Sequence, residues 1–222
     1  MFSRLAWRPL VVVTAAAALA AGPSRAQIVV FNNFGPGDAY NTGTGWTLGT
    51  GSNYIVGEQF TPSASGTLDK IELALGLMDG LNSAKVYLVA DSSGQPGATV
   101  LENWTTTSMG VFGHNNPLLV FNSAAHPSLT SGTPYWIYVD ATTNSPTTWA
   151  VWNWNSTGGT GPRASSTNGG VTWSVSPGDT QGAFRVTVQG PGGATPVPAA
   201  PVVSAIGAGV YALCFFRKRR PA

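Results

Sequence analysis

The sequence predicts an all-β fold, an antiparallel β-sandwich of the jelly-roll type, with a signal helix before it and a hydrophobic helix after it. Three observations lead to this prediction. Apolar and polar residues alternate between residues 27 and 190 with the period of two that half-buried strands have. Short runs of this kind are separated by clusters of Gly, Pro, Asn, Asp and Ser, which favour turns. No apolar stripe of helical period is sustained, and many short strands without helices are typical of sandwiches.

The first 26 residues have the three parts of a secretory signal peptide. Arg4 and Arg8 supply a positive start, an apolar run follows over residues 10–21, and Ser24-Arg25-Ala26 places small residues around a cleavage position. A cut between Ala26 and Gln27 would make Gln27 the mature N-terminus.

The exported body, residues 27–190, divides into short segments with strand character. In one of them Tyr135, Ile137 and Val139 share a face, and Trp136 and Tyr138 lie on the other. Glycine-rich stretches at residues 35–52 and 158–161 are predicted to be loops, and residues 91–97 a tight turn. Strands are predicted at residues 27–34, 54–61, 70–75, 84–88, 100–104, 108–112, 118–122, 135–140, 149–154, 171–175 and 184–189.

The chain ends in three segments that together are typical of a membrane anchor. Residues 191–201 are a Pro-, Gly- and Ala-rich linker, residues 202–216 an uncharged apolar helix, and residues 217–222 a basic tail. A helix over residues 202–216 rises roughly 22 Å, and a start at Ala199 adds about one turn toward the roughly 30 Å hydrocarbon core of a bilayer. Basic clusters stay on the cytoplasmic side, so the body would lie outside. The cluster consists of Arg217, Lys218, Arg219 and Arg220.

A short motif stands directly before the apolar helix, at Pro196, Val197, Pro198 and Ala199. Motif, helix and basic cluster in this order resemble the PEP-CTERM sorting signal of exopolysaccharide-producing bacteria, in its Val-Pro-Leu-Pro-Ala variant. Thr195 stands where Val is usual, and no Glu lies between the prolines. The resemblance implies cleavage by an exosortase-like enzyme, with the helix in the membrane until then. A plain single-span anchor is the alternative.

Four stretches of the body carry a second resemblance. They are Glu58-Gln59-Phe60-Thr61-Pro62, residues 68–75, residues 86–97 with the turn Gly94-Gln95-Pro96-Gly97, and residues 129–136 ending in Pro134-Tyr135-Trp136. Together they resemble the bacterial choice-of-anchor extracellular domains, the R type in particular. This resemblance implies a surface β-domain and brings no catalytic residues with it.

Charge and cysteine content narrow the partners of the body. All nine acidic residues lie between Gln27 and Thr195, against four cations, which leaves a net charge of about −5 there. A basic patch that could neutralise phosphates is therefore missing, and we expect no nucleic-acid partner. The only cysteine, Cys214, lies in the apolar tail, so the body must be stabilised by its core and not by disulfides.

Common catalytic motifs, such as Gly-x-Ser-x-Gly or His-Glu-x-x-His, do not occur in the sequence. We therefore expect a non-catalytic protein without a cofactor. Glycoside hydrolysis needs only two carboxylates, so an extracellular hydrolase is a third interpretation, with Glu58, Glu72, Asp91 and Glu102 as candidates by residue type. Asp38 and Asp91 lie in polar, Gly-containing loops where each could bind a structural Ca²⁺ or cap a turn.

Tryptophan is the residue type that most suggests a binding function. In residues 149–154, alternation places Trp152 and Trp154 on one face of a strand and Trp149 on the other. Exposed indoles can stack on sugar rings while amides bind the hydroxyls, so Trp152, Trp154 and Asn153 are candidate exopolysaccharide-binding residues. The alternative is that the tryptophans fill the core.

These inferences converge on an exported bacterial protein of the cell surface or extracellular matrix, sorted by its tail. Its β-domain would be structural or would bind a partner without catalysis. A carbohydrate-binding module that uses exposed tryptophans is the alternative.

Overall fold

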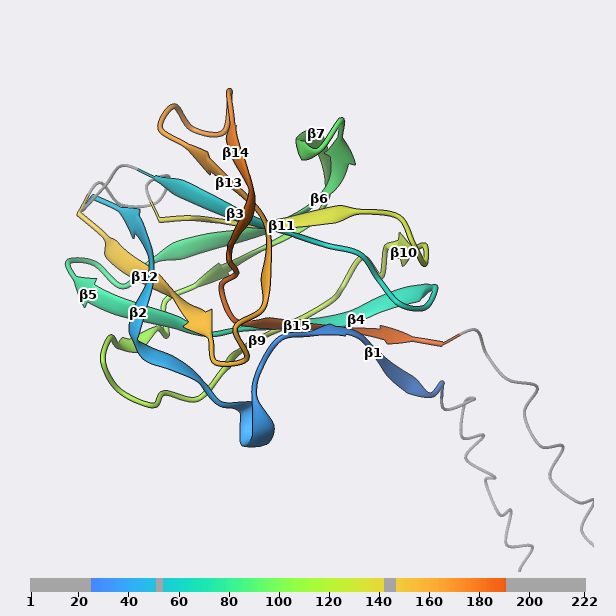
Figure 1. The fold of residues 1–222 in the computed structure, drawn as a ribbon, viewed down its shortest axis with the longest axis horizontal. Helices are drawn as coiled ribbons and strands as arrows, with labels where there is room; N and C mark the ends of the chain where they lie inside the picture. The colour runs from blue at the N-terminus through green and yellow to red at the C-terminus, as the bar shows by residue number, and fades with distance from the viewer. Residues whose placement is uncertain (1–24, 51–53, 142–146, 191–222) are drawn as a thin grey trace, which may run out of the picture.

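A computed structural model describes residues 25–50, 54–141 and 147–190 (Figure 1). These residues form mainly antiparallel strands and, besides one 3-10 turn at Pro36–Asp38, no helix, so the all-β prediction is confirmed for them. The predicted signal helix, linker, hydrophobic helix and basic tail lie outside the described residues. Within the described part of the chain, no helix has the length and apolar character that spanning a membrane requires.

The described strands assemble into three sheets. The first has the order β1-β15-β4-β10 with β9 also paired to β4, the second β14-β13-β3-β11-β6-β7, and the third β2-β12-β5-β8. The strands are β1 (Gln27–Asn32), β2 (Tyr40–Gly49), β3 (Ile55–Phe60), β4 (Gly66–Leu73), β5 (Leu75–Asp79), β6 (Ala84–Ser92), β7 (Gln95–Thr106), β8 (Gly110–Val111), β9 (Leu119–Asn122), β10 (Ser128–Leu129), β11 (Tyr135–Asp140), β12 (Trp149–Asn155), β13 (Thr160–Ser166), β14 (Ser174–Thr180) and β15 (Phe184–Gln189).

The main core lies where the three sheets meet, around Phe184 of β15 in the first sheet. Its ring stacks on Phe31 of β1 with 4.4 Å between the ring centroids. It meets Phe60 of the second sheet edge-on at 6.0 Å and Trp152 of the third sheet at 5.8 Å. Because all four rings belong to one buried cluster or pack against it, the three sheets share a single apolar interior.

Strand β11 shows how alternation sorts side chains in the second sheet. Tyr135, Ile137 and Val139 were predicted to share one face, and all three belong to the main core. Trp136 is equally buried, but it packs in a separate cluster on the opposite face, against which Tyr138 also packs. Both faces of β11 are covered, because the main core lies on one side and Trp136 packs with Val89 and Ala164 on the other.

Two strands form where glycine-rich loops were predicted, and these predictions were wrong. Strand β2 occupies Tyr40–Gly49 and pairs with β12, with Trp46 opposite Trp152. Its glycines permit this pairing, since a Cβ at Gly45 would overlap the backbone of Trp152. Strand β13 begins at Thr160, inside the loop predicted at residues 158–161, and it pairs with β3 and β14.

The two ends of the described domain lie side by side. Strands β1 and β15 pair antiparallel, with Gln27 opposite Gln189 (Figure 1). The Gly190 amide donates to the Ala26 carbonyl at 2.9 Å. The Asp69 carboxylate accepts hydrogen bonds from the side chains of Gln27 at 2.7 Å and Gln189 at 3.0 Å. The chain therefore enters and leaves the domain at one edge of the first sheet.

Candidate functional site

Two of the three predicted sugar-binding residues lie in the interior. Trp152 is fully buried, and its Nε1 donates to the Ala183 carbonyl at 3.1 Å. Asn153 is 3% exposed, and its amide donates to the Asn41 carbonyl at 2.9 Å. The prediction that Trp152 and Asn153 are exposed for sugar binding was therefore wrong. Both faces of the central part of β12 are covered, because Trp152 packs against Phe184 in the main core and Asn153, on the other face, donates to the carbonyls of Asn41 and Thr42.

Trp154, the third predicted residue, is half-buried and belongs to an aromatic cluster. Its ring meets Trp46 edge-on, with 5.3 Å between centroids. The guanidinium of Arg163 lies over the Trp46 ring at 3.9 Å, a cation–π contact. Arg163 is held there by Asp179, whose Oδ2 lies 2.7 Å from both Nε and Nη2. The Nε1 of Trp154 is buried without a hydrogen-bond partner among the described groups.

A buried acid, Glu58, lies on β3 directly opposite Arg163 of β13. Its Oε1 accepts a hydrogen bond from the Gly182 amide at 2.9 Å, and its Oε2 has no partner among the described groups. Complete burial raises the pKa of Glu58 well above its ordinary value, and the charge of Arg163 offsets this only partly. Glu58 is thus a carboxyl group whose surroundings favour the neutral form.

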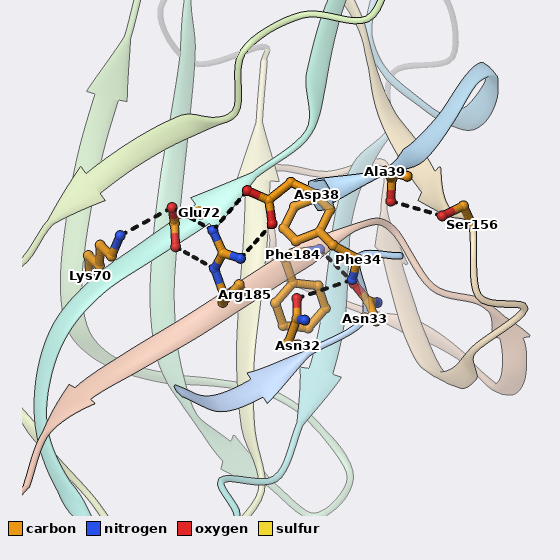
Figure 2. Close-up of polar contacts among 10 residues, drawn as sticks. All are labelled: Asn32, Asn33, Phe34, Asp38, Ala39, Lys70, Glu72, Ser156, Phe184 and Arg185. Carbon is orange, nitrogen blue, oxygen red and sulfur yellow. Dashed lines mark hydrogen bonds and ion pairs between the residues drawn. The ribbon is translucent and has the colours of Figure 1, made fainter. Parts of the chain in front are cut away.

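Glu72 and Asp38 are joined by Arg185 in the first sheet (Figure 2). Arg185 Nε donates to Glu72 Oε2 at 2.6 Å, and Nη1 donates to Asp38 Oδ1 at 2.7 Å. Lys70 reaches Glu72 Oε1 at 3.2 Å from the other side. The hydrogen bonds from Arg185 lower the pKa of Glu72 despite its burial. This network ties the turn at Asp38, a residue with φ of 62°, to β4 and β15.

The remaining carboxylates proposed as catalytic or calcium-binding candidates also hold the fold together. Asp91 Oδ1 accepts from Trp136 Nε1 at 2.7 Å, and Oδ2 caps the turn at Gly94 at 3.0 Å. Glu102 accepts from the Ser123 hydroxyl at 2.5 Å and from the Ala124 amide at 2.6 Å. Glu58, Glu72, Asp91 and Glu102 each have separate partners. Across the described residues, no group of three or more His, Cys, Asp or Glu side chains is arranged to hold a metal ion.

A groove that the sequence did not single out lies between β7 of the second sheet and β9 of the first. It has a volume of about 510 Å³. Trp104 of β7 crosses from one sheet to the other, because its Nε1 donates to the Asn122 carbonyl at 2.8 Å. The groove is lined by Trp104, Thr105, Thr106, Ser108, Leu118, Leu119, Val120, Phe121 and Asn122. The sequence signal that could have indicated this groove is Trp104 between the polar residues Asn103 and Thr105.

The predicted sorting residues Pro196, Val197, Pro198 and Ala199 and the basic cluster lie outside the described residues. Of the predicted cleavage pair, Ala26 and Gln27 are both described, at the edge of the first sheet. Comparison with known proteins adds no relative: no protein-family model, no curated protein and no solved structure matches the chain.

Proposed function

We propose that this chain is an exported protein of the bacterial surface or extracellular matrix, brought there by a signal peptide and a PEP-CTERM-like tail. The observation that carries this proposal is the extent of the folded domain. Strand β1 begins at Gln27, directly after the expected cut, and β15 ends at Gln189, directly before the expected linker. The β-domain thus fills the interval between the two targeting segments that the sequence indicates.

The domain itself we take to be a non-catalytic β-sandwich of the jelly-roll, choice-of-anchor type. Support comes from the use made of its carboxylates. Glu72 pairs with Arg185, Asp91 with Trp136, and Glu102 caps a loop, so these groups have structural roles. A structural or binding role at the surface fits a domain whose polar chemistry serves its own fold.

A second candidate function is binding of exopolysaccharide. The groove at Trp104 favours it, since a partly exposed indole there lies beside hydroxyl and amide side chains. We therefore assign the candidate sugar site to this groove and not to Trp152 and Asn153, because those two residues are buried.

The sorting proposal can be tested by motif variants expressed in a bacterium that has an exosortase-like enzyme. We expect the wild type to lose its tail and to reach the surface or matrix. Pro196→Ala combined with Pro198→Ala should keep the full tail and remain in the membrane. Pro201→Ala, in the same linker but outside the motif, is the matched control and should behave as wild type. Equal mass and location for all three proteins would refute sorting by this motif.

A further inference from the structure

We propose that the groove at Trp104 binds a neutral polysaccharide, with the indole as the platform for a sugar ring. The inference rests on the second proposed function, sugar binding, and it assigns the site and the class of sugar. The targeting segments imply neither the position of a sugar site nor the class of sugar. Sugar binding in the groove and sorting by the tail can therefore be tested separately.

The position of Trp104 is fixed before any ligand arrives. Its Nε1 is engaged by the Asn122 carbonyl at 2.8 Å, and its ring packs near Phe121 with 6.0 Å between centroids. A side chain that is already immobilised loses less conformational entropy when a ligand binds than a mobile one does. The indole is half-buried and lines the groove, so part of its surface remains available to a ligand.

The rest of the groove supplies what a sugar needs besides an aromatic ring. Thr105, Ser108 and Asn122 are exposed and offer hydroxyl and amide groups. Leu119 and Val120 supply apolar surface for the C–H groups of a sugar ring. A volume of about 510 Å³ lies in the range of small-ligand sites. Mixed aromatic and hydroxyl surface of this kind matches a sugar, which has apolar ring faces and a polar rim.

Charge decides between neutral and acidic polysaccharides. None of the described residues that line the groove is charged. The exported body carries nine acidic residues against four cations, so its field repels a polyanion. Carboxylated sugars would enter the groove without a cationic partner, and we therefore assign it to neutral chains.

The groove lies at the end of β7, which contributes Trp104, Thr105 and Thr106 to its lining. This strand pairs with β6 and forms the edge of the second sheet. It runs over Gln95–Thr106, longer than the other described strands. An extended chain can therefore lie along the edge, with one ring at Trp104 and neighbouring rings beyond it.

The test uses the full chain, purified in a zwitterionic detergent that has no sugar headgroup. Calorimetric titration with a soluble β-glucan and a galactomannan probes neutral chains, and alginate probes acidic ones. We expect saturable binding of at least one neutral polysaccharide and none of alginate. Trp104→Ala should weaken binding about tenfold or more, as truncation of an aromatic anchor does.

Trp104 also packs against the core, so a second variant keeps the test independent of folding. Ser108→Arg places a long side chain in the groove from an exposed position, and it should weaken binding to a similar extent without lowering Tm. Thr107→Arg, exposed and next to it but outside the groove lining, is the matched control and should bind as wild type.

Each outcome is decisive. If the wild type binds none of the three polysaccharides, sugar binding fails as a function, and the sorting proposal is unaffected. If the wild type binds but Ser108→Arg and Trp104→Ala bind equally well, sugar binding stands and the groove is not its site. Binding of alginate alone would overturn the assignment to neutral chains.

Discussion

At the scale of single residues, Glu58 is the group whose environment departs most from that of an ordinary surface acid. It is fully buried, it has one hydrogen bond from the Gly182 amide, and its second oxygen has no described partner. A carboxylate in such a place loses hydration that a single amide and the nearby Arg163 do not replace. Protonation of Glu58 is therefore linked to folding.

Replacement of this acid by its amide should change how stability depends on pH. Because burial raises the pKa of Glu58 in the folded state, the native protein binds this proton more tightly than the unfolded chain does. The resulting stability is complete below the unfolded pKa of about 4.3 and is lost as pH rises through the folded pKa. Glu58→Gln should therefore gain stability relative to wild type as the pH rises. Urea unfolding at acidic and alkaline pH measures this.

Glu72→Gln is the matched control for that experiment, because Arg185 lowers the pKa of Glu72. Its contribution to stability is present above the unfolded pKa and is lost as pH falls through the folded pKa, the opposite direction. Parallel pH profiles for Glu58→Gln and wild type would show that Glu58 is not a buried acid.

Gly182 lies too close to Trp152 to carry a side chain. A Cβ on this residue would lie 2.6 Å from the indole of Trp152, whose position is fixed by the surrounding core. Gly182→Ala should lower the free energy of unfolding by about 1–3 kcal/mol through overpacking. Gly178→Ala, where a Cβ meets nothing within 4 Å, should have little effect. Thermal unfolding of both variants gives the comparison, and equal Tm values would contradict the packing around Trp152.

At the scale of elements, alternation predicted many of the strands, but it missed β2 and β13 and did not show which strand faces are covered. In β12 the sequence predicts that Trp152 and Trp154 share one face. It does not reveal that β2 pairs alongside, because β2 is rich in glycine and has the composition of a loop. Burial depends on what packs on each face, and in β12 those contacts come from distant parts of the chain, from Phe184 on one face and the Asn41 carbonyl on the other.

Strand β7 and the loop after β9 are joined across two sheets by Glu102. Its carboxylate accepts hydrogen bonds from the Ser123 hydroxyl and from the amides of Ala124 and Ala125. Glu102→Ala leaves these donors without a partner and should cost about 3 kcal/mol of stability. Glu102→Gln retains one acceptor oxygen and should cost less. Chemical denaturation ranks the variants, and an unchanged midpoint for Glu102→Ala would contradict this role.

At the scale of the whole molecule, the sequence predicted the class of fold but not the order of its strands. Strand β3 pairs with β11 and β13, and β15 pairs with β1 and β4, all across long sequence separations. Spacing and composition are local signals, whereas these pairings are set by the shared core around Phe184. The groove at Trp104 depends on the same long-range arrangement, since β7 and β9 belong to different sheets.

We propose that the folded domain is exported and that the targeting segments before and after it are both removed. The most direct measurement is the intact mass of the protein isolated from the envelope or matrix of its host. We predict a chain that begins at Gln27 and ends near Pro196–Ala199. A chain that still carries Met1 to Ala26 would contradict export by a signal peptide, and one that still carries Arg217 to Arg220 would contradict processing and leave a plain membrane anchor.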